Sequence, residues 1–548
     1  MLAITSFLCY NTVMEKMTFE GLPALIIEYI SGLESRLEKQ QAQIDRLTEL
    51  LILAQKARFG SSSEKAKYIL SDGYEQETLF NEAEAYANED EPETVVVEQH
   101  TRKPKRTKEE LAKDLPVKKV VIDIPEDGRV CDICKGALRA IGQELVRREL
   151  SIIPSQTFIT ETYRINYSCD DCLEKTDDAN IVKPEVPEPV VKRGLASPSS
   201  AAYVMYQKFV NAMPLYRQAK DWENFGVKIS RGTLANWIIY TSLHWLLPLW
   251  NALKALLLGS PVIHGDETTI QVLKEPGKTP QSDSYMWVYC TGKYAGRPPP
   301  IVLFEYQSNR AGENPKAFLE GAKDFYLITD GYAGYNTVES VTHCGCWAHQ
   351  RRRLEEAMPK NAPKDNVARV GFEFCQKLFA LERKFEKLTP GERLEQRVVQ
   401  SKPVLDKFYK WVGSVNPLAG SRLAKAITYA VNQKGPLSAF LLDGRIEISN
   451  NRIENMLRPV TLGRRNWLFA DSMDGARASA IAYSIIRTAT ANGLNPYQYL
   501  LHLFTYLPTV LSKDPKADLS PFFPWDKGVQ DKCKYAADAK GQLTLLEQ

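Results

Sequence analysis

The sequence predicts a multidomain protein whose largest part is an α/β core that carries a large helical insertion. Three observations lead to this fold class. The chain has 548 residues, which corresponds to three or four domains of ordinary size. Apolar, β-branched runs alternate with short helical runs between residues 261 and 349, which is typical of a sheet with helices packed on it. A heptad pattern, two Cys-x-x-Cys pairs and a helix–turn–helix pattern precede this stretch.

The composition is that of a globular chain. Hydrophobic residues make up 44% and charged residues 25%, which excludes a wholly disordered chain and an integral membrane bundle. The net charge is only +3, so any binding of nucleic acid must depend on where the charges lie. The longest apolar stretch, 246–258, is interrupted by Pro248, Asn251 and Lys254 and predicts a buried helix rather than a membrane span. With no signal-peptide pattern and few cysteines, we expect a cytoplasmic protein without a membrane partner.

The N-terminal part begins with residues 1–22, to which we assign no structure; Met1, Met14 and Met17 remain alternative starts. Residues 23–60 carry apolar side chains at alternating spacings of three and four, which predicts a coiled coil and hence a homo-oligomer. An amphipathic helix packed on its own domain is the alternative. Residues 61–115 change from an acidic to a basic run and predict a charged linker. The basic run either contacts phosphates or is solvated.

Two cysteine pairs follow, in a segment that we assign as a zinc-binding module at 116–194. The four cysteines are Cys131, Cys134, Cys169 and Cys172, and 34 residues separate the two pairs. Each Cys-x-x-Cys turn lets two sulfurs face one ion, so the set suits tetrahedral Zn²⁺ in a structural role. Four reduced cysteines in a small core are the alternative.

Residues 195–258 predict a helical DNA-binding region with a helix–turn–helix. Pro214 suits the first turn of a helix, Gly226 suits its end, and Ser230 suits the cap of the next helix. That second helix presents side chains able to reach base edges or phosphates, namely Arg231, Thr233 and Asn236. A helical hairpin that only packs against the core would have a similar pattern.

The core begins at residues 259–353. The predicted order is three strands, a helix, a strand, a helix, a strand and a helix. This is the element order of the ribonuclease-H-like fold, in which acidic residues of the first and fourth strands and of a late helix meet at one point. Asp266 and Asp330 hold the first two places, and Glu454 holds the third on a helix that starts near residues 450–451.

Three carboxylates at one point favour a cation site, because they repel one another unless cations are bound. Two Mg²⁺ ions about 3.5–4 Å apart can stabilise the attacking and leaving oxygens of a phosphodiester, and such hard ions prefer carboxylate oxygen. We therefore expect Mg²⁺, with Mn²⁺ as the alternative, at Asp266, Asp330 and Glu454. Glu447 is the runner-up for the third carboxylate, and Glu267 flanks the first.

The remaining boundaries follow from this core. The 124 positions from Asp330 to Glu454 exceed what one strand–helix step needs, so residues 354–441 predict a helical insertion that clamps DNA or mediates assembly. An inert spacer is the alternative. The core resumes at 442–500, and we assign 501–548 to a C-terminal tail.

Two groups of arginines lie near the predicted carboxylates. Clustered guanidiniums beside an aromatic ring suit phosphate binding and base stacking, although a solvated surface has the same composition. The candidates for DNA contact are Arg351, Arg352, Arg353, Arg458, Arg464 and Arg465, with Trp467 as the aromatic residue. A second set, His343, Cys344, Cys346 and His349, resembles a metal cluster, but we expect a structural role for it.

Several motifs together resemble one known family. They are HGDET (264–268), ITDGYAGYN (328–336), GCWAHQRRRL (345–354), ISNNRIENMLRP (448–459), GRRNWLF (463–469) and LNPYQYL (494–500). In this order, after a coiled coil, a paired-cysteine module and a helix–turn–helix, they resemble the insertion sequence 66 transposases of bacterial mobile elements. The resemblance covers nearly the whole chain.

The resemblance implies a DDE transposase with Asp266, Asp330 and Glu454 as its cation-binding triad. It also implies double-stranded DNA with terminal inverted repeats as substrate, Mg²⁺ as cofactor, and small accessory proteins of the same element as partners. We then expect the protein to associate with the nucleoid when bound to DNA. In one respect the chain departs from the family pattern: the usual Glu-Arg is Glu454-Asn455 here, which removes one cation that Arg452 and Arg458 would have to replace.

Two other functions fit parts of the sequence. A zinc-containing DNA-binding regulator with an inactive core shares the N-terminal features. A carboxylate-dependent hydrolase, such as a glycosidase, would use Asp266 and Glu267, but adjacent residues of a strand point to opposite faces. We therefore rank the hydrolase last.

Overall fold

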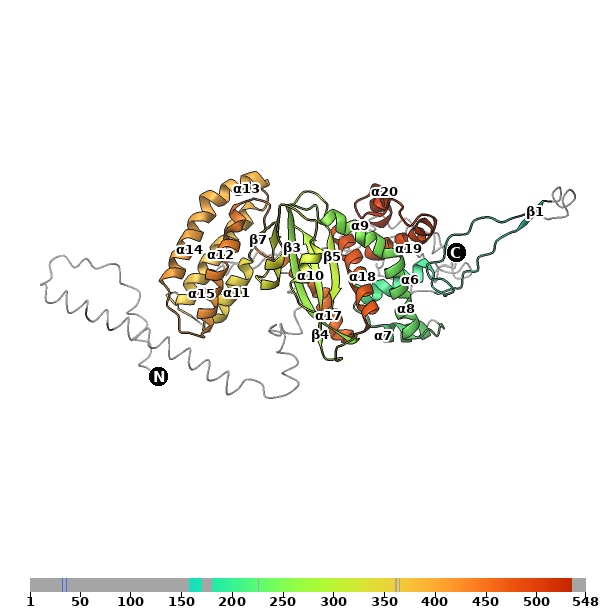
Figure 1. The fold of residues 1–548 in the computed structure, drawn as a ribbon, viewed down its shortest axis with the longest axis horizontal. Helices are drawn as coiled ribbons and strands as arrows, with labels where there is room; N and C mark the ends of the chain where they lie inside the picture. The colour runs from blue at the N-terminus through green and yellow to red at the C-terminus, as the bar shows by residue number, and fades with distance from the viewer. Residues whose placement is uncertain are drawn as a thin grey trace, which may run out of the picture.

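The computed structural model describes residues 157–169, 180–224, 226–359, 362–363 and 365–534, together with Gly32 and Arg36. The predicted coiled coil, the charged linker and most of the zinc-binding module therefore lie outside the described residues. In the described part, a central sheet separates two groups of helices (Figure 1). One group consists of the helices before β3 (Val262–Lys274) and after β8 (Ala470–Ser472). The other group is inserted between β7 (Val341–Cys344) and α17 (Asn451–Trp467).

The central sheet has the strand order β5-β4-β3-β6-β7, and β8 pairs with the far end of β3. Strands β4 and β5 run antiparallel to their neighbours, whereas β6, β7 and β8 run parallel to theirs. The strands are β3 (Val262–Lys274), β4 (Asp283–Thr291), β5 (Val302–Gln307), β6 (Phe325–Ile328), β7 (Val341–Cys344) and β8 (Ala470–Ser472). A separate two-stranded sheet pairs β1 (Tyr167–Cys169) with β2 (Asn180–Val182).

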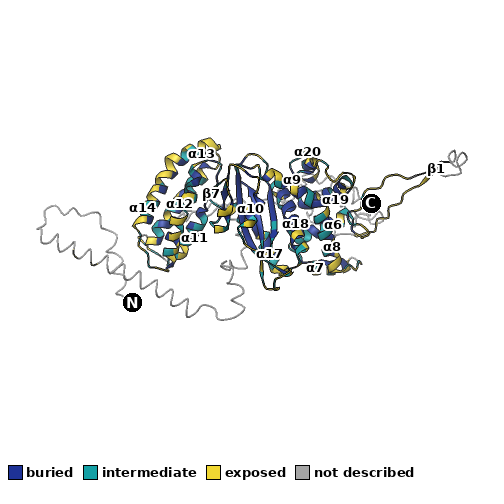
Figure 2. Cartoon of the chain, viewed as in Figure 1, coloured by how far each residue is buried: buried dark blue, intermediate teal, exposed yellow. Residues whose placement is uncertain are grey.

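Strand β3 is the centre of the core. Its first seven residues are all buried, because helices cover both faces of the sheet, which Figure 2 shows as the darkest part of the molecule. Such a strand needs a nearly continuous apolar run, yet β3 buries His264, Asp266 and Glu267 in it. Buried ionisable groups are costly unless they are paired or bind cations, so these three side chains mark a site.

The helices before the sheet follow the predicted pattern. They are α6 (Pro198–Phe209), α7 (Leu215–Asn224), α8 (Arg231–Thr241), the π-helix η2 (Ser242–Leu246) and α9 (Leu247–Leu257). Gly226, which has φ +81°, follows α7 and suits a left-handed turn that L side chains avoid. Ser230 caps α8, since its Oγ accepts a hydrogen bond from the Thr233 N–H at 3.1 Å.

The apolar stretch at 246–258 forms α9, which buries Leu249, Trp250, Leu253 and Leu257 in the core. Among the described residues, no helix has both the length and the apolar character that a membrane crossing requires.

The helices after the insertion complete the larger core. They are α17 (Asn451–Trp467), α18 (Met473–Ala491), α19 (Pro496–Lys513), the 3₁₀-helix η6 (Ser520–Phe522) and α20 (Lys527–Cys533). Helix α18 is rich in alanine and lies against the edge strand β5, where Ser484 and Thr488 accept hydrogen bonds from the backbone N–H groups of Phe304 and Val302. The segment predicted as a C-terminal tail differs from that description, because residues 501–513 continue α19 and bury Leu503, Phe504 and Leu507.

The regular structure of the inserted segment is all helical among its described residues, with turns and loops between the helices. It contains α11 (Trp347–Ala357), α12 (Val367–Phe385), α13 (Pro390–Gln396), η4 (Arg397–Ser401), α14 (Lys402–Ser414), α15 (Arg422–Asn432), α16 (Lys434–Ser438) and η5 (Ala439–Leu441). Its apolar core is continuous with one edge of the sheet, since Ile328 and Cys344 of β6 and β7 belong to the same cluster as Trp347, Leu378 and Phe408. The bundle is thus packed onto the sheet. Two shorter elements, α10 (Glu313–Phe318) and the 3₁₀-helix η3 (Ala333–Thr337), lie between strands.

Two buried arginines tie the bundle to the segment that leads back to the sheet. Arg397 forms an ion pair with Glu382, with Nη2 to Oε2 at 2.6 Å. It also donates to backbone carbonyls of the returning segment, those of Phe440, Asp443 and Ile446. Arg393 donates to the carbonyl of Gly444 at 3.1 Å. Because a guanidinium presents five donors in a fixed geometry, these contacts hold residues 440–446 against α12 and η4.

Candidate active site

Asp266 lies on β3, opposite Val288 of β4, with 8% of its surface exposed. Burial raises the pKa of Asp266 well above its ordinary value, and the carboxylates of Glu267, Asp330 and Glu454 raise it further. One hydrogen bond opposes this, from the Glu267 backbone N–H to Asp266 Oδ1 at 2.9 Å. The structure therefore brings the three carboxylates of the sequence prediction within electrostatic reach of one another.

Asp330 stands just beyond the end of β6, the parallel neighbour of β3. Its Oδ1 accepts the backbone N–H of Tyr332 at 2.8 Å, and its carbonyl accepts the Tyr429 hydroxyl of α15 at 3.0 Å. Gly331 follows with φ +92°, and a Cβ there would also press on the Gln433 side chain at 3.2 Å. A glycine is therefore required for the turn that presents Asp330 between the sheet and the bundle.

Glu454 is in the first turn of α17. Asn450, fully buried before this helix, fixes its start: Nδ2 donates to the Gly265 carbonyl at 3.1 Å, and the backbone N–H points to Cys346 Sγ at 3.1 Å. Its Oδ1 lies 2.9 Å from His264 Nδ1. The site thus depends on a polar contact between β3 and α17 that the sequence analysis did not predict, although His264 lies two residues before Asp266 and so on the same face of β3.

Glu447, the runner-up, has other partners. Its Oε2 lies 2.8 Å from His264 Nε2 and accepts the Lys293 backbone N–H at 2.7 Å. Burial acts to raise the pKa of Glu447, but the His264 imidazole and its hydrogen bond lower it below the ordinary value. His264 therefore bridges Asn450 and Glu447, with a side-chain oxygen facing each of its ring nitrogens.

Glu267, the other flanking carboxylate, points away from Asp266 along the strand alternation. Its side chain is 1% exposed and forms an ion pair with Arg310, with Nη2 to Oε1 at 2.6 Å. The Tyr335 hydroxyl donates to its other oxygen at 2.9 Å. Burial, and then the Asp330 charge, raise the pKa of Glu267, while Arg310 opposes them. Both of its oxygens are therefore engaged by the protein itself.

The three consecutive arginines of α11 point in different directions. The guanidinium of Arg351 lies 5.4 Å from the ring centroid of Phe372, and that of Arg353 lies 4.6 Å from the Tyr429 ring. Both contacts are with helices of the bundle. Arg352 is half-exposed and lies 3.5 Å from Glu454 Oε2. Of the three, Arg352 is the one directed at a carboxylate of the site.

The second arginine group lies along α17, where Arg458 and Arg465 are exposed. Arg464 is half-buried and donates to Thr269 of β3, at 2.7 Å to Oγ1. The aromatic residue of this group, Trp467, packs edge-on against Phe209 of α6, with ring centroids 6.5 Å apart. Its contact with α6 makes Trp467 part of the packing between helices.

The three helix–turn–helix candidates are all exposed on α8. Arg231, Thr233 and Asn236 are exposed, whereas Leu234, Trp237 and Ile238 on the other face are buried. This is the arrangement that a helix needs to present polar side chains to a groove while it stays anchored in the protein.

The histidine and cysteine set is divided by the structure. Cys344 is buried in β7, where its Sγ contacts the Thr342 carbonyl at 3.6 Å. Cys346 and His349 instead meet Glu454, with one ligand atom of each residue within 4.8 Å of the others. Burial raises the pKa of the Cys346 thiol to about 12. Burial also lowers the pKa of His349, although Glu454 and Asp330 oppose it.

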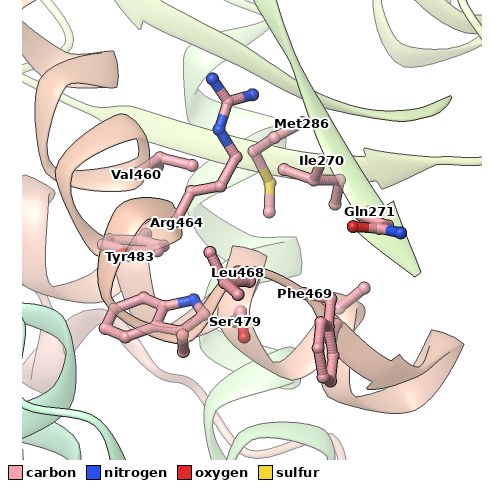
Figure 3. Close-up of a pocket in the computed structure, with 12 residues that line it drawn as sticks. Ile270, Gln271, Met286, Val460, Arg464, Leu468, Phe469, Ser479 and Tyr483 are labelled. Carbon is pink, nitrogen blue, oxygen red and sulfur yellow. The ribbon is translucent and has the colours of Figure 1, made fainter. Parts of the chain in front are cut away.

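A small cavity of about 40 Å³ lies between β3, β4 and the end of α17, away from the carboxylates (Figure 3). Its walls are mostly apolar and include Ile270, Met286, Val460, Leu468 and Phe469. It has room for about one water molecule.

A larger, open hollow of about 390 Å³ adjoins Asp330. It is formed by Gly331 and by polar or basic side chains of α11 and α15, among them Arg353, Lys425, Thr428 and Gln433. Its two cationic side chains, Arg353 and Lys425, suit an anionic group such as a phosphate.

Comparisons with known proteins give the family. The family model described as "Transposase IS66 family" matches residues 193–478, which is more than half of the chain. The model "zinc-finger binding domain of transposase IS66" matches residues 129–172, and "Transposase C of IS166 homeodomain" matches residues 46–120. The chain belongs to the IS66 family of transposases.

The matches also bear on the N-terminal parts. The zinc-finger match spans all four predicted cysteines and supports zinc binding there. The match at 46–120 covers the end of the predicted coiled coil and the predicted charged linker, so a family domain extends across a region that the charge pattern alone assigned to a linker.

Three relatives from Sinorhizobium fredii cover most of the chain, and each is named as an uncharacterized protein. Protein y4hP is 29% identical over 85% of this chain and 86% of its own length. Protein y4jD is 29% identical over 76% and 81%, and protein y4qI is 26% identical over 93% and 94%.

Proposed function

We propose that this transposase cuts DNA at the terminal inverted repeats of its element and joins the freed ends to target DNA. The observation that carries the proposal is the convergence of Asp266, Asp330 and Glu454 from β3, the end of β6 and the start of α17. Burial raises the pKa of Asp266, and the charges of Glu267, Asp330 and Glu454 raise it further, so a bound cation would stabilise the ionised carboxylate.

The proposed core is ribonuclease-H-like. Support comes from the strand order β5-β4-β3-β6-β7, with three antiparallel strands followed by two parallel ones. In this arrangement the first and fourth strands of the core, β3 and β6, are neighbours. Their acidic residues therefore lie close together, at the end of β6. Helix α17 then brings the third carboxylate to the same place.

The residues fit a site for Mg²⁺ or Mn²⁺. The donors are carboxylate oxygens, which hard divalent cations prefer, and Glu454 Oε1 is buried without a hydrogen-bond partner among the described residues. Asp266 and Asp330 would hold both ions, and Glu454 would complete one of them. When bound, such ions polarise the phosphodiester and stabilise the attacking and leaving oxygens.

The protein's own side chains have distinct tasks in this scheme. Water attacks phosphorus at the element's end and the 3′-oxygen leaves; the 3′-hydroxyl then attacks a target phosphodiester, so that one P–O bond forms as another breaks in each step. Arg352, beside Glu454, and the hollow with Arg353 and Lys425 offer positive charge to the DNA backbone. Asn450 positions α17 through its contacts with β3.

The other domains would serve binding and assembly. We assign Zn²⁺ to Cys131, Cys134, Cys169 and Cys172, end recognition to the exposed face of α8, and oligomerisation to the coiled coil at 23–60. The helical insertion would clamp DNA beside Asp330, with accessory proteins of the same element as further partners.

Asp330→Asn tests the catalytic assignment. We expect it to abolish Mg²⁺-dependent joining of DNA ends, assayed with purified protein and a labelled inverted-repeat duplex, while binding of that duplex persists. The matched control is Asp324→Asn at the opposite end of β6, an exposed residue with φ +52°, a conformation that asparagine tolerates. Joining of ends by Asp330→Asn would refute the mechanism.

The second candidate, a DNA-binding regulator with an inactive core, is favoured by Asn455, where the family pattern has arginine. It predicts that the wild-type protein binds inverted repeats but cuts them with neither Mg²⁺ nor Mn²⁺. The same assay distinguishes the two functions.

A further inference from the structure

The start of helix α11 carries a second group of potential metal ligands beside the acidic cluster. Cys346 is the N-cap residue of α11 and His349 is its third residue, so both side chains can face the same point at the helix end. Glu454 approaches this point from α17. One ligand atom from each residue, the sulfur, an imidazole nitrogen and a carboxylate oxygen, lies within 4.8 Å of the other two.

Two of these atoms are buried and unsatisfied. His349 Nδ1 and Glu454 Oε1 have no hydrogen-bond partner in the described part of the chain. They face each other at 3.9 Å, which is too long for a hydrogen bond. Buried polar atoms without a partner are rare in folded proteins and frequently indicate an ion or a water.

The type of ligand identifies the class of metal. Thiolate sulfur and imidazole nitrogen select Zn²⁺ and similar ions, whereas Mg²⁺ takes oxygen ligands. With Zn–S near 2.3 Å and Zn–N or Zn–O near 2.1 Å, the ligand atoms of a tetrahedral site lie about 3.5 Å apart. The observed separations, up to 4.8 Å, exceed this by at most about 1.3 Å, a contraction that rotation of the Glu454 and His349 side chains can supply.

We propose that Cys346, His349 and Glu454 form a binding site for Zn²⁺ or a similar thiophilic dication, and that an ion there withdraws Glu454 from the Mg²⁺ site. Binding displaces the thiol proton of Cys346 to solvent and leaves a fourth ligand position open. The Asn450 N–H, 3.1 Å from Cys346 Sγ, helps to stabilise the resulting thiolate. The inhibitory consequence rests on the proposed function, because it requires Glu454 to serve catalysis, whereas the binding itself does not.

The neighbouring charges define how strong such binding can be. Arg352 lies 3.5 Å from Glu454 Oε2, and its positive charge opposes a dication. The oxygen that faces His349 is Oε1, on the other side of the carboxylate, and Asp330 adds negative charge near His349. Glu454 cannot bind strongly at both cation sites at once, so the thiophilic ion and the catalytic ions compete for it.

A cobalt titration of the full-length protein tests the binding. Co²⁺ bound to thiolate absorbs in the near ultraviolet and visible range, so each added equivalent can be followed by spectroscopy. Any metal held by the zinc-finger module is common to all variants and cancels in the comparison. We expect wild-type protein to bind one more equivalent of Co²⁺ than His349→Ala or Cys346→Ser.

The matched controls are His343→Ala and Cys344→Ser, which alter the same residue types six and two positions away, outside the cluster. We expect both to bind as much Co²⁺ as the wild type. Equal stoichiometry in wild type and His349→Ala would overturn the proposal. Because His349 is partly exposed and Cys346 is fully buried, His349→Ala decides the question if Cys346→Ser fails to fold.

An activity measurement tests the consequence. With Mg²⁺ in excess, Zn²⁺ should inhibit strand joining by the wild type, and His349→Ala should need at least about ten times more Zn²⁺ for the same fractional inhibition of its own rate. Equal zinc sensitivity would overturn the competition for Glu454. A protein that binds the extra Co²⁺ but never joins DNA with Mg²⁺ alone would refute the proposed function and leave the metal site intact.

Discussion

Replacing Arg310 by methionine tests whether Glu267 is a structural residue of the core. Arg310 approaches the buried Glu267 carboxylate through two nitrogens, Nε at 2.8 Å and Nη2 at 2.6 Å from Oε1. The substitution removes both and leaves the Tyr335 hydroxyl as the remaining donor. Glu267 would then be an almost unpaired charge in the centre of the sheet.

The expected magnitude follows from the burial of the two partners. Removing one partner of a buried ion pair destabilises a protein by about 3–5 kcal/mol. Arg310 is 43% exposed, so water screens the pair and can reach the vacated space. We therefore expect Arg310→Met to lower the free energy of unfolding by about 2–3 kcal/mol at pH 8.

The loss should depend on pH. The pKa of Glu267 is already raised above its ordinary value of 4.5, and without Arg310 it rises further. An acid whose pKa is higher in the folded state destabilises the fold as the pH rises from its unfolded pKa through its folded one. The destabilisation by Arg310→Met should therefore be smaller at pH 5, where Glu267 in the variant binds a proton more readily, than at pH 8.

Urea denaturation of the full-length protein, followed by tryptophan fluorescence at both pH values, measures the effect. Lys316→Met is the control, because it breaks an exposed pair with Glu339 that should contribute less than about 1 kcal/mol. Adding Glu267→Gln to Arg310→Met should restore part of the loss at pH 8. If Arg310→Met were as stable as Lys316→Met at pH 8, Glu267 would not need its partner, and the reasoning would be wrong.

Three further predictions concern the site and its DNA contacts. Because the pKa of Asp266 is raised by burial and by neighbouring carboxylates, the melting temperature measured in EDTA should fall as the pH rises through that pKa. Mg²⁺ or the substitution Asp266→Asn should reduce this fall. A difference in melting temperature between wild type and Asp266→Asn that does not change with pH would contradict the prediction. Glu447→Gln should lower the free energy of unfolding by about 1–3 kcal/mol, because His264 loses its charged partner, yet the variant should still join DNA ends in a cation-dependent manner. If a folded Glu447→Gln variant no longer joined DNA ends, Glu447 would be the third carboxylate. Arg231→Ala should weaken binding to all DNA sequences and lower the salt dependence by about one unit, whereas Asn236→Ala should cost about 1–3 kcal/mol mainly on the specific site, both measured by fluorescence anisotropy at several salt concentrations.

The sequence was sufficient to predict strands β3 to β7 and the elements that carry Asp266 and Asp330, whereas β8 was not predicted. Strand β3 has a β-branched apolar run around Asp266, and Asp330 follows a similar run and precedes Gly331, so the sequence pattern alone places Asp266 in a strand and Asp330 at a strand end. Glu454 could not be placed from a local pattern, because it lies 124 positions after Asp330. The structure brings all three together because the whole insertion is packed to one side of the sheet.

The partners of these residues could not be predicted, since they depend on tertiary contacts. Three successive arginines look alike in sequence, yet the helical rotation of about 100° per residue directs Arg351 and Arg353 towards aromatic rings of the bundle and Arg352 towards Glu454. The pairing of Glu267 with Arg310, 43 positions away, has no periodic signal. The same holds for Trp467, whose contact with Phe209 depends on the packing of α17 against α6.

The segment from 440 to 446, whose carbonyls are held by Arg393 and Arg397, is also the path from the bundle to α17. It acts as a short rigid link, because few of its backbone groups are free to rearrange. A shift of α12 or η4 would therefore be passed on to the helix that carries Glu454 rather than absorbed by the link. If DNA docks on the bundle as proposed, the position of Glu454 would respond to that docking.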